Sequence, residues 1–95
     1  MTIEFDWDQW NLQKNELKHG VSRLEAESVF FDPLYSMFGD KKHSRTEDRY
    51  LLIGKSIEGR ILIVGFTHRK AAIRIITARP ASKKERVIYE GKKSE

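Results

Sequence analysis

RILIVGFTHRKAAIRIITARPASKKER, residues 60–86, is the stretch that decides the fold. It contains an unbroken apolar run at residues 61–64 and a second run, rich in β-branched residues, at residues 73–79. Each run has the length of a strand, and the polar residues 68–70 between them predict an antiparallel hairpin. Because residues 61–64 are apolar on both faces, the first strand should lie in the interior of a sheet that is covered on both sides.

A helix is predicted directly after this hairpin. Ser82 and Glu85 have the spacing of a capping box, so we expect a helix over roughly residues 83–90. Residues 91–95 are polar and should form a frayed, disordered tail. Residues 60–86 also hold eight Lys or Arg side chains and one acid. A rigid hairpin that is also the most basic part of the chain is the predicted functional face.

Charge is distributed unevenly along the 95 residues, which we expect to form one domain. Residues 1–40 carry a net charge of −5 and residues 41–95 a net charge of +9, which together give +4. Two explanations stay open: the basic half binds a polyanion, or the two halves partly neutralise each other within the fold.

The composition excludes several classes of site. The chain has no cysteine, which rules out disulfides and thiolate zinc sites. No run approaches about 18 apolar residues, and the N-terminus lacks the pattern of a signal peptide. We therefore expect a soluble cytoplasmic protein without a membrane partner.

The N-terminal quarter predicts a strand and a capped helix. Residues 3–7 alternate apolar and acidic side chains, as a short edge strand does. Asp8 and Gly20 stand where an N-cap and a C-terminal glycine belong, and they bound a helix over residues 9–18. The buried stripe of this helix should consist of Trp10, Leu12 and Leu17. Trp7 and Trp10 are both expected to pack in the core rather than to stack on bases.

The middle of the chain predicts a second helix and then strands. Ser22 and Glu25 form another capping box, and Pro33 ends this helix. Residues 34–38 and 49–55 predict strands that are separated by a long polar loop. The element order is then β-α-α-β-β-β-β-α. It predicts an α+β fold with an antiparallel sheet of four to five strands and the helical pair on one face.

Residues across most of the chain resemble the BrnT family. The resemblance is carried by Trp7-Asp8, Asn15, Lys18-His19-Gly20-Val21, Val29-Phe30, Asp32-Pro33, Glu47, Arg49, Ile53-Gly54, Thr67, Arg69, Arg74-Ile75-Ile76-Thr77-Ala78-Arg79, Glu85-Arg86 and Tyr89. It extends over residues 5–89, and its most specific parts are the Lys-His-Gly and Ile-Ile-Thr-Ala-Arg elements. Asn11 and His68 depart from the pattern, since a lysine and an acidic residue are usual there.

The resemblance implies that residues 1–95 are a single BrnT-like domain with a fold similar to RelE-like ribonucleases. It also implies a toxin of a type II toxin–antitoxin pair. The implied partner is a BrnA-like antitoxin that carries a DNA-binding domain and neutralises the toxin by direct binding. A heterotetramer is then expected, with DNA contacted only through the antitoxin and RNA as the substrate.

RNA cleavage without a metal needs a base for the 2′-hydroxyl, cations for the phosphorane and an acid for the leaving oxygen. The predicted strands at residues 49–55, 60–67 and 72–79 contain no acid, which favours chemistry that uses no metal or other cofactor. With the resemblance, the predicted catalytic residues are Arg79 and Arg69 as phosphate ligands, with His19 or Glu47 as the proton-transfer group. Further RNA contacts are predicted at Lys18, Arg49, Arg86 and Lys83.

Regular strand alternation restricts which arginines can act together. If residues 69 and 70 form a two-residue turn, Arg74 lies opposite Gly65 and on the face opposite to Arg79, unless a bulge intervenes. Arg74 is therefore predicted to be structural and to pair with Glu25 or Glu27 of the helical half.

Simpler roles remain for the other groups. His19 can cap the C-terminus of its helix, Glu47 can pair with Arg49, and His43 and His68 are weaker candidates. Two other functions also stay open: a non-enzymatic nucleic-acid-binding module, and a protein-interaction domain with a basic face. The first of these needs aromatic side chains exposed among the basic residues.

Overall fold

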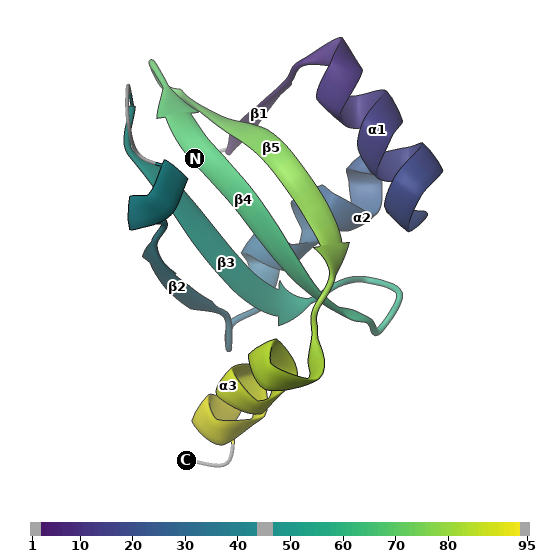
Figure 1. Cartoon of the computed structure of the whole chain (residues 1–95), viewed down its shortest axis with the longest axis vertical. Coiled ribbons are helices and arrows are strands. Elements are labelled where there is room, and N and C mark those ends of the chain that lie inside the picture. Colours follow the sequence, from purple (N-terminus) through teal and green to yellow (C-terminus); the bar gives the residue numbers. More distant parts are fainter. Residues whose placement is uncertain (1–2, 44–46, 94–95) are drawn as a thin grey trace.

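The computed structural model describes residues 3–43 and 47–93, which form one β-sheet with helices against both of its faces (Figure 1). The elements are β1 (Glu4–Trp7), α1 (Gln9–His19), α2 (Arg23–Ser28), a 3-10 turn (Val29–Phe31), β2 (Ser36–Gly39), a 3-10 turn (Lys41–His43), β3 (Arg49–Lys55), β4 (Ile61–Arg69), β5 (Ala72–Pro80) and α3 (Lys83–Lys93). The predicted α+β class and the predicted order of elements are confirmed.

β4 lies in the middle of the sheet, as its run of apolar residues predicts. The strand order is β1-β5-β4-β3-β2. Leu62 and Val64 are fully buried and belong to the same core cluster as Ala26 and Val29, at α2 and the turn that follows it. Burying a side chain of this size stabilises the fold by about 1.5–3 kcal/mol, so this cluster holds α2 against the sheet.

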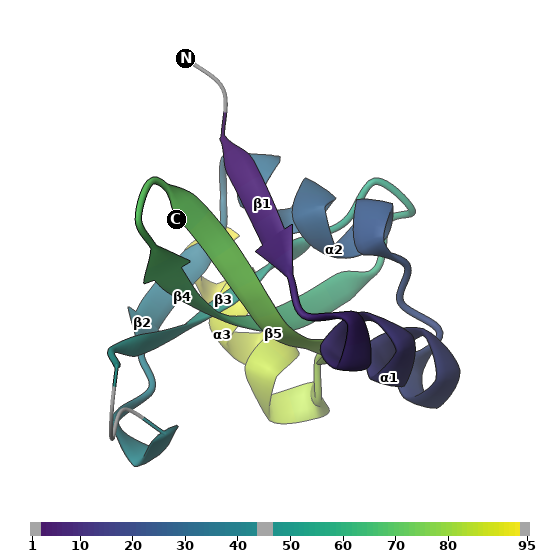
Figure 2. The ribbon, with the colours of Figure 1, turned by 90° about the horizontal axis from the view of Figure 1, so that it is seen from above.

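The sheet is mixed, so the prediction of a purely antiparallel sheet is wrong in one pairing. β1 runs parallel to β5, with Phe5 opposite Ile73 and Trp7 opposite Ile75, and the other three pairings are antiparallel. Alternation at residues 3–7 indicates a strand but carries no information on its direction. β1 runs with β5 and leads into α1, which lies beside the C-terminal half of β5 (Figure 2).

α1 begins and ends at the predicted caps, and α2 begins after Ser22 as predicted, but α2 ends at Ser28 and continues as the 3-10 turn instead of running on to Pro33. Asp8 accepts hydrogen bonds from the first N–H groups of α1, and Gly20 takes the left-handed conformation that ends it, with φ of 63°. Ser22 accepts a hydrogen bond from the Glu25 N–H at 3.1 Å. The Glu25 carboxylate turns inward instead of completing the capping box, and it accepts hydrogen bonds from Arg60.

The inner face of α1 differs from the prediction. Trp10 and Leu17 are 71% and 89% exposed, so they do not form a buried stripe, whereas Trp7 packs against the core as predicted. The inward contact of α1 is polar. Asn15 is 1% exposed, and its Oδ1 accepts a hydrogen bond from the Ala78 N–H of β5 at 3.2 Å. That N–H lies beyond the four-residue pairing of β1 with β5, so Asn15 satisfies a backbone donor that β1 leaves open.

The β4–β5 hairpin turns one residue later than predicted. Arg69 pairs with Ala72, so the turn consists of Lys70 and Ala71. Lys70 has a positive φ of 55°, which a tight hairpin turn requires.

A β-bulge in β5 also changes which arginines share a face. Ile76 is the extra residue, because Thr77 and Ile75 pair with two consecutive residues of β4. The bulge shifts the alternation of β5 by one residue. Arg74 and Arg79 therefore lie on the same face of the sheet, not on opposite faces as regular alternation predicts.

Arg74 has an acidic partner, but not the predicted one. Its Nε donates to Asp6 Oδ2 at 2.9 Å, from β5 to the neighbouring strand β1. Glu25 is paired with Arg60, and Glu27 is paired with an arginine one turn before it in α2.

α3 covers part of the second face of the sheet. Tyr89 is buried against Ile63, and its hydroxyl donates to Asp32 at 2.7 Å. The predicted capping box is complete, since the Glu85 N–H donates to Ser82 Oγ at 3.2 Å and the Ser82 N–H donates to Glu85 Oε1 at 2.8 Å. α3 continues through Lys93, three residues beyond the predicted end, so most of the predicted tail is helical. Residues 94–95 lie outside the described part of the chain.

Candidate functional site

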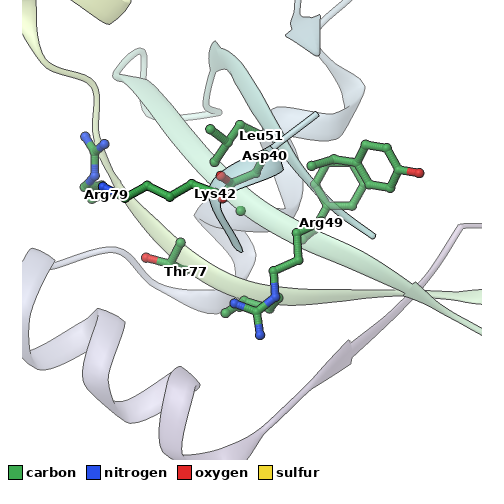
Figure 3. Close-up of a pocket in the computed structure, with 10 residues that line it drawn as sticks. Asp40, Lys42, Arg49, Leu51, Thr77 and Arg79 are labelled. Carbon is green, nitrogen blue, oxygen red and sulfur yellow. The ribbon is translucent and has the colours of Figure 1, made fainter. Parts of the chain in front are cut away.

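The face of the sheet beside α3 contains a cleft of about 400 Å³ (Figure 3). Its walls come from β3, β4, β5 and the segment after β2. The lining residues are Asp40, Lys42, Arg49, Tyr50, Leu51, Gly65, Phe66, Ile76, Thr77 and Arg79. Arg79 and Arg49 lie at opposite ends of this cleft, with Thr77 between them (Figure 3).

Strand register explains why these side chains meet. Arg49 pairs with Thr67, and Arg79 pairs with Ile63, so the two arginines lie on β3 and β5, the strands that flank β4. Strand spacing places their Cα atoms about 16 Å apart, which leaves room for long side chains to converge from both ends. Between them Gly65 has no side chain, and a Cβ there would lie 2.8 Å from Thr77 Cγ2. The missing side chain keeps the middle of the cleft open.

Arg79 is engaged with α3. Its guanidinium donates to both carboxylate oxygens of Glu85 at 2.9 Å, in the two-pronged geometry that arginine also uses for phosphate. These hydrogen bonds are the largest cause of the fall in the Glu85 pKa to about 2, and they raise the pKa of Arg79. A carboxylate thus occupies the position on Arg79 that a phosphate oxygen pair would take.

His19 ends α1 near the cleft. Partial burial and the positive charges of Lys18, Arg79 and Lys14, in that order, lower the pKa of the His19 imidazole below its usual 6.5. Arg79 is thus one of the cations whose charge disfavours protonation of His19. His19 is therefore neutral at pH 7, which is the form that accepts a proton.

Arg69 and Glu47 lie at the other end of the sheet. Glu47 Oε2 is 3.6 Å from Arg69 Nε, and Arg69 borders a separate hollow near the hairpin turn. Arg69 is six residues from Ile63, the partner of Arg79, which amounts to about 20 Å along β4. The structure therefore does not bring Arg69 and Arg79 to one phosphate.

The remaining predicted residues are spread around the cleft. Lys83 and Arg86 are exposed on the first turns of α3, and Lys18 is exposed on α1. His68 contacts the rings of Tyr50 and Phe66, and the side chain of His43 lies outside the described residues.

Sequence reasoning missed Lys42, Asp40 and Thr77. Lys42 and Asp40 follow β2 in a segment without hydrophobic periodicity, so no pattern could place them over the sheet. Thr77 faces the cleft because the bulge shifts the alternation of β5 by one residue. The residues Ile75-Ile76-Thr77 at the bulge read as an ordinary strand, so the sequence does not indicate the shift.

The described residues contain no group of three or more His, Asp or Glu side chains arranged to hold a metal ion. Within the same part of the chain, no helix is long and apolar enough to cross a membrane. Asp40 is the single acid among the described residues that line the cleft, against Lys42, Arg49 and Arg79. The excess positive charge suits a phosphodiester.

The fold and the site define a class of small α+β proteins that hold cations on an open sheet face. The sequence matches the family described as the ribonuclease toxin BrnT of type II toxin–antitoxin systems over residues 7–85. The chain belongs to this family, which confirms the resemblance, and it is a ribonuclease toxin of the type II toxin–antitoxin class.

A solved structure supports the same assignment. The fold is similar to the crystal structure of the Brucella abortus ribonuclease toxin BrnT, with 28% sequence identity and a TM-score of 0.66. The match covers 86% of this chain and 100% of that chain. Among curated proteins, none matches the sequence.

Proposed function

We propose that this toxin is an endoribonuclease that cuts RNA without a metal ion in the cleft between Arg49 and Arg79. The observation that carries the proposal is the placement of these two guanidinium groups on one face of the sheet, at opposite ends of an open hollow. Guanidinium groups give paired hydrogen bonds to phosphate oxygens, and the underlying strands hold them in place. Lys42 adds a third positive charge from the segment after β2.

His19 is the preferred proton-transfer group in this site. The neutral imidazole takes the proton of the 2′-hydroxyl as that oxygen attacks the neighbouring phosphorus. The phosphorane that forms carries extra negative charge, which Arg49 and Arg79 stabilise. The bond to the 5′-oxygen then breaks, and that oxygen takes a proton from solvent water, while the proton on His19 is released to solvent. Glu47 is the alternative base, and in that case cleavage takes place beside Arg69, at the hairpin end of the sheet.

RNA binding at Arg79 requires an exchange of partners. Glu85 occupies both prongs of the Arg79 guanidinium, so a phosphate has to displace the carboxylate. Arg79 makes the same number of charged hydrogen bonds before and after this exchange. Glu85 loses its contact with Arg79 but keeps its hydrogen bonds with Ser82 at the start of α3.

Single-turnover cleavage of a labelled RNA in EDTA tests the proposal. The wild-type chain should cut RNA, and the rate should fall as pH drops below the lowered pKa of His19, because the imidazole is then protonated. His19→Gln should remove this pH dependence and lower the rate by roughly a hundredfold or more. Absence of cleavage in EDTA with full recovery on adding Mg²⁺ would refute metal independence.

The antitoxin is the second part of the proposal. Membership of the family implies an antitoxin partner, and we infer that it is BrnA-like, acts in the cytoplasm and forms a two-plus-two assembly through a dimeric DNA-binding part. The toxin then contacts DNA only through its partner. The segregated charge of the chain supports an acidic antitoxin segment over the basic face.

A further inference from the structure

Trp10 is a large aromatic side chain that the core does not use. It is 71% exposed on the outward face of α1, although Trp7, three residues earlier, packs against the core. An indole in that position exposes a flat π-face to solvent. Such a residue is informative, because most of the large apolar surface of a small domain is needed in its core.

The surroundings of Trp10 are basic. A shallow hollow of about 310 Å³ on α1 is lined by Trp10, Gln13, Lys14, Leu17 and Lys18. Lys14 and Lys18 follow Trp10 at intervals of four residues, so the three side chains form one stripe with steps of about 6 Å along the helix. None of the described lining residues is acidic.

This stripe leads toward the cleft. α1 packs beside β5, and Asn15 fixes it there through the hydrogen bond to Ala78, next to Arg79. His19 and Gly20 follow Lys18 at the end of α1, where Gly20 C=O accepts a hydrogen bond from Arg60 at the start of the β4 segment. A strand that leaves the cleft at Arg79 and follows α1 would meet Lys18 first, then Lys14, and reach Trp10 about 12 Å beyond Lys18.

We propose that Trp10 is a stacking platform for a base of single-stranded RNA, and that Lys14 and Lys18 bind the phosphates between it and the cleft. The site resembles the general design of sequence-tolerant binders, which combine aromatic faces with a positively charged track. This inference rests on the proposed ribonuclease function, since it concerns the same RNA.

RNA is a better occupant than a protein because the apolar area is small. Trp10 and Leu17 are the two apolar side chains of the hollow, and the remaining lining residues are polar or charged. A stable protein interface buries about 800 Å² on each partner, which this stripe alone does not supply. One stacked base needs a single aromatic face and nearby cations.

Binding of an unstructured 20-nucleotide RNA of mixed sequence, followed by anisotropy, tests the platform. Trp10→Ala should weaken binding by roughly five- to 150-fold, the range for a lost stacking partner. Trp10→Phe should keep most of the affinity, and the matched control Leu17→Ala should change it less than twofold. Lys14→Ala should lower the slope of log affinity against log salt by about 0.7, a change that Trp10→Ala should not produce.

Two further readouts separate this inference from the proposed function. RNA should quench the indole fluorescence of the wild type and leave that of Trp10→Phe, which reports Trp7 alone, unchanged. At saturating RNA, Trp10→Ala should cleave within twofold of wild type, because the platform is remote from the cleft.

Unchanged RNA affinity in Trp10→Ala alongside normal wild-type cleavage would overturn the platform and leave the ribonuclease proposal standing. Weakened antitoxin binding with unchanged RNA binding would assign the stripe to a protein and would also overturn it.

Discussion

Arg79 shows how one residue can serve both the fold and the site. Its guanidinium joins β5 to the first turn of α3 through Glu85, and it also faces the cleft. If the role of Arg79 is structural, substitution of Arg79 and substitution of Glu85 should lower activity equally, because each breaks the same ion pair. A role as phosphate ligand predicts that the two losses differ, because only Arg79 contacts RNA.

We expect Arg79→Lys and Glu85→Gln to have different effects on cleavage. Lysine keeps the charge but cannot make the paired contact, so the single-turnover rate should fall by roughly a hundred- to a thousandfold. Glutamine keeps the capping box and removes the competing charge, so RNA affinity should stay the same or increase. Thermal melts of both variants provide the control for folding. Equal losses of activity in the two variants would make Arg79 a structural residue.

The residues that sequence reasoning placed well are those with a local cause. Asp8, Gly20 and Ser82 act within a few residues of themselves, so spacing alone identifies them as caps. Trp10 was assigned to the core because its size suggests burial, whereas the real inner contact of α1 is the polar Asn15. Lys42 could not be predicted as part of the cleft, because its position depends on how the chain returns after β2.

At the scale of elements, the position of β4 is predicted correctly. Its side chains are apolar on both faces, and such a strand is buried only in the interior of a sheet. The parallel pairing of β1 and the bulge in β5 were not predictable in the same way. Both depend on neighbouring strands, and a one-residue shift of alternation moves Arg79 to the other face. The composition of the cleft therefore follows from the bulge more than from any motif.

The attachment of α3 should depend on pH. The folded-state pKa of Glu85 is about 2, below its ordinary 4.5, so its ion pair with Arg79 stabilises the folded state fully above pH 4.5. That contribution is lost as pH falls from 4.5 toward 2. Because Arg79 is partly exposed, the effect should be modest, about 1 kcal/mol.

Amide exchange of α3 measured at pH 6 and at pH 3 checks this dependence, after correction for the intrinsic effect of pH. Protection of residues 85–89 should decrease more than that of residues 62–66 in β4. In Glu85→Gln the additional decrease should disappear. An equal decrease for α3 and β4 in the wild type would show that the ion pair does not hold the helix.

At the scale of the whole molecule, the acidic and the basic halves of the sequence form different elements of the fold. The acidic N-terminal half supplies β1, the helical pair and β2, and the basic half supplies β3, β4, β5 and α3. Pairs such as Asp6 with Arg74 and Glu25 with Arg60 join the halves, so part of the charge is neutralised internally. Internal neutralisation therefore explains part of the uneven charge, and binding of a polyanion at the cations of the cleft stays a prediction.

RNA and antitoxin should compete for this surface. We expect the free toxin to bind RNA and the preformed toxin–antitoxin complex to bind it at least tenfold more weakly, because in the proposed assembly the antitoxin covers the basic face. Electrophoretic mobility of labelled RNA with free toxin and with purified complex measures the difference. Equal affinity in the two states would place the antitoxin elsewhere on the fold.

The central claim is that the cleft between Arg49 and Arg79 is where RNA is cut. Its most direct test compares Arg49→Lys with Arg23→Lys in single-turnover cleavage at saturating RNA in EDTA. Arg23 is an exposed arginine on α2, where it pairs with Glu27, and it lies outside the cleft, so it controls for the loss of a guanidinium. With melts that match the wild type, Arg49→Lys should cut roughly a hundred- to a thousandfold more slowly, and Arg23→Lys within twofold of wild type. Cleavage by Arg49→Lys within threefold of wild type would contradict the claim and leave the cleft a binding surface.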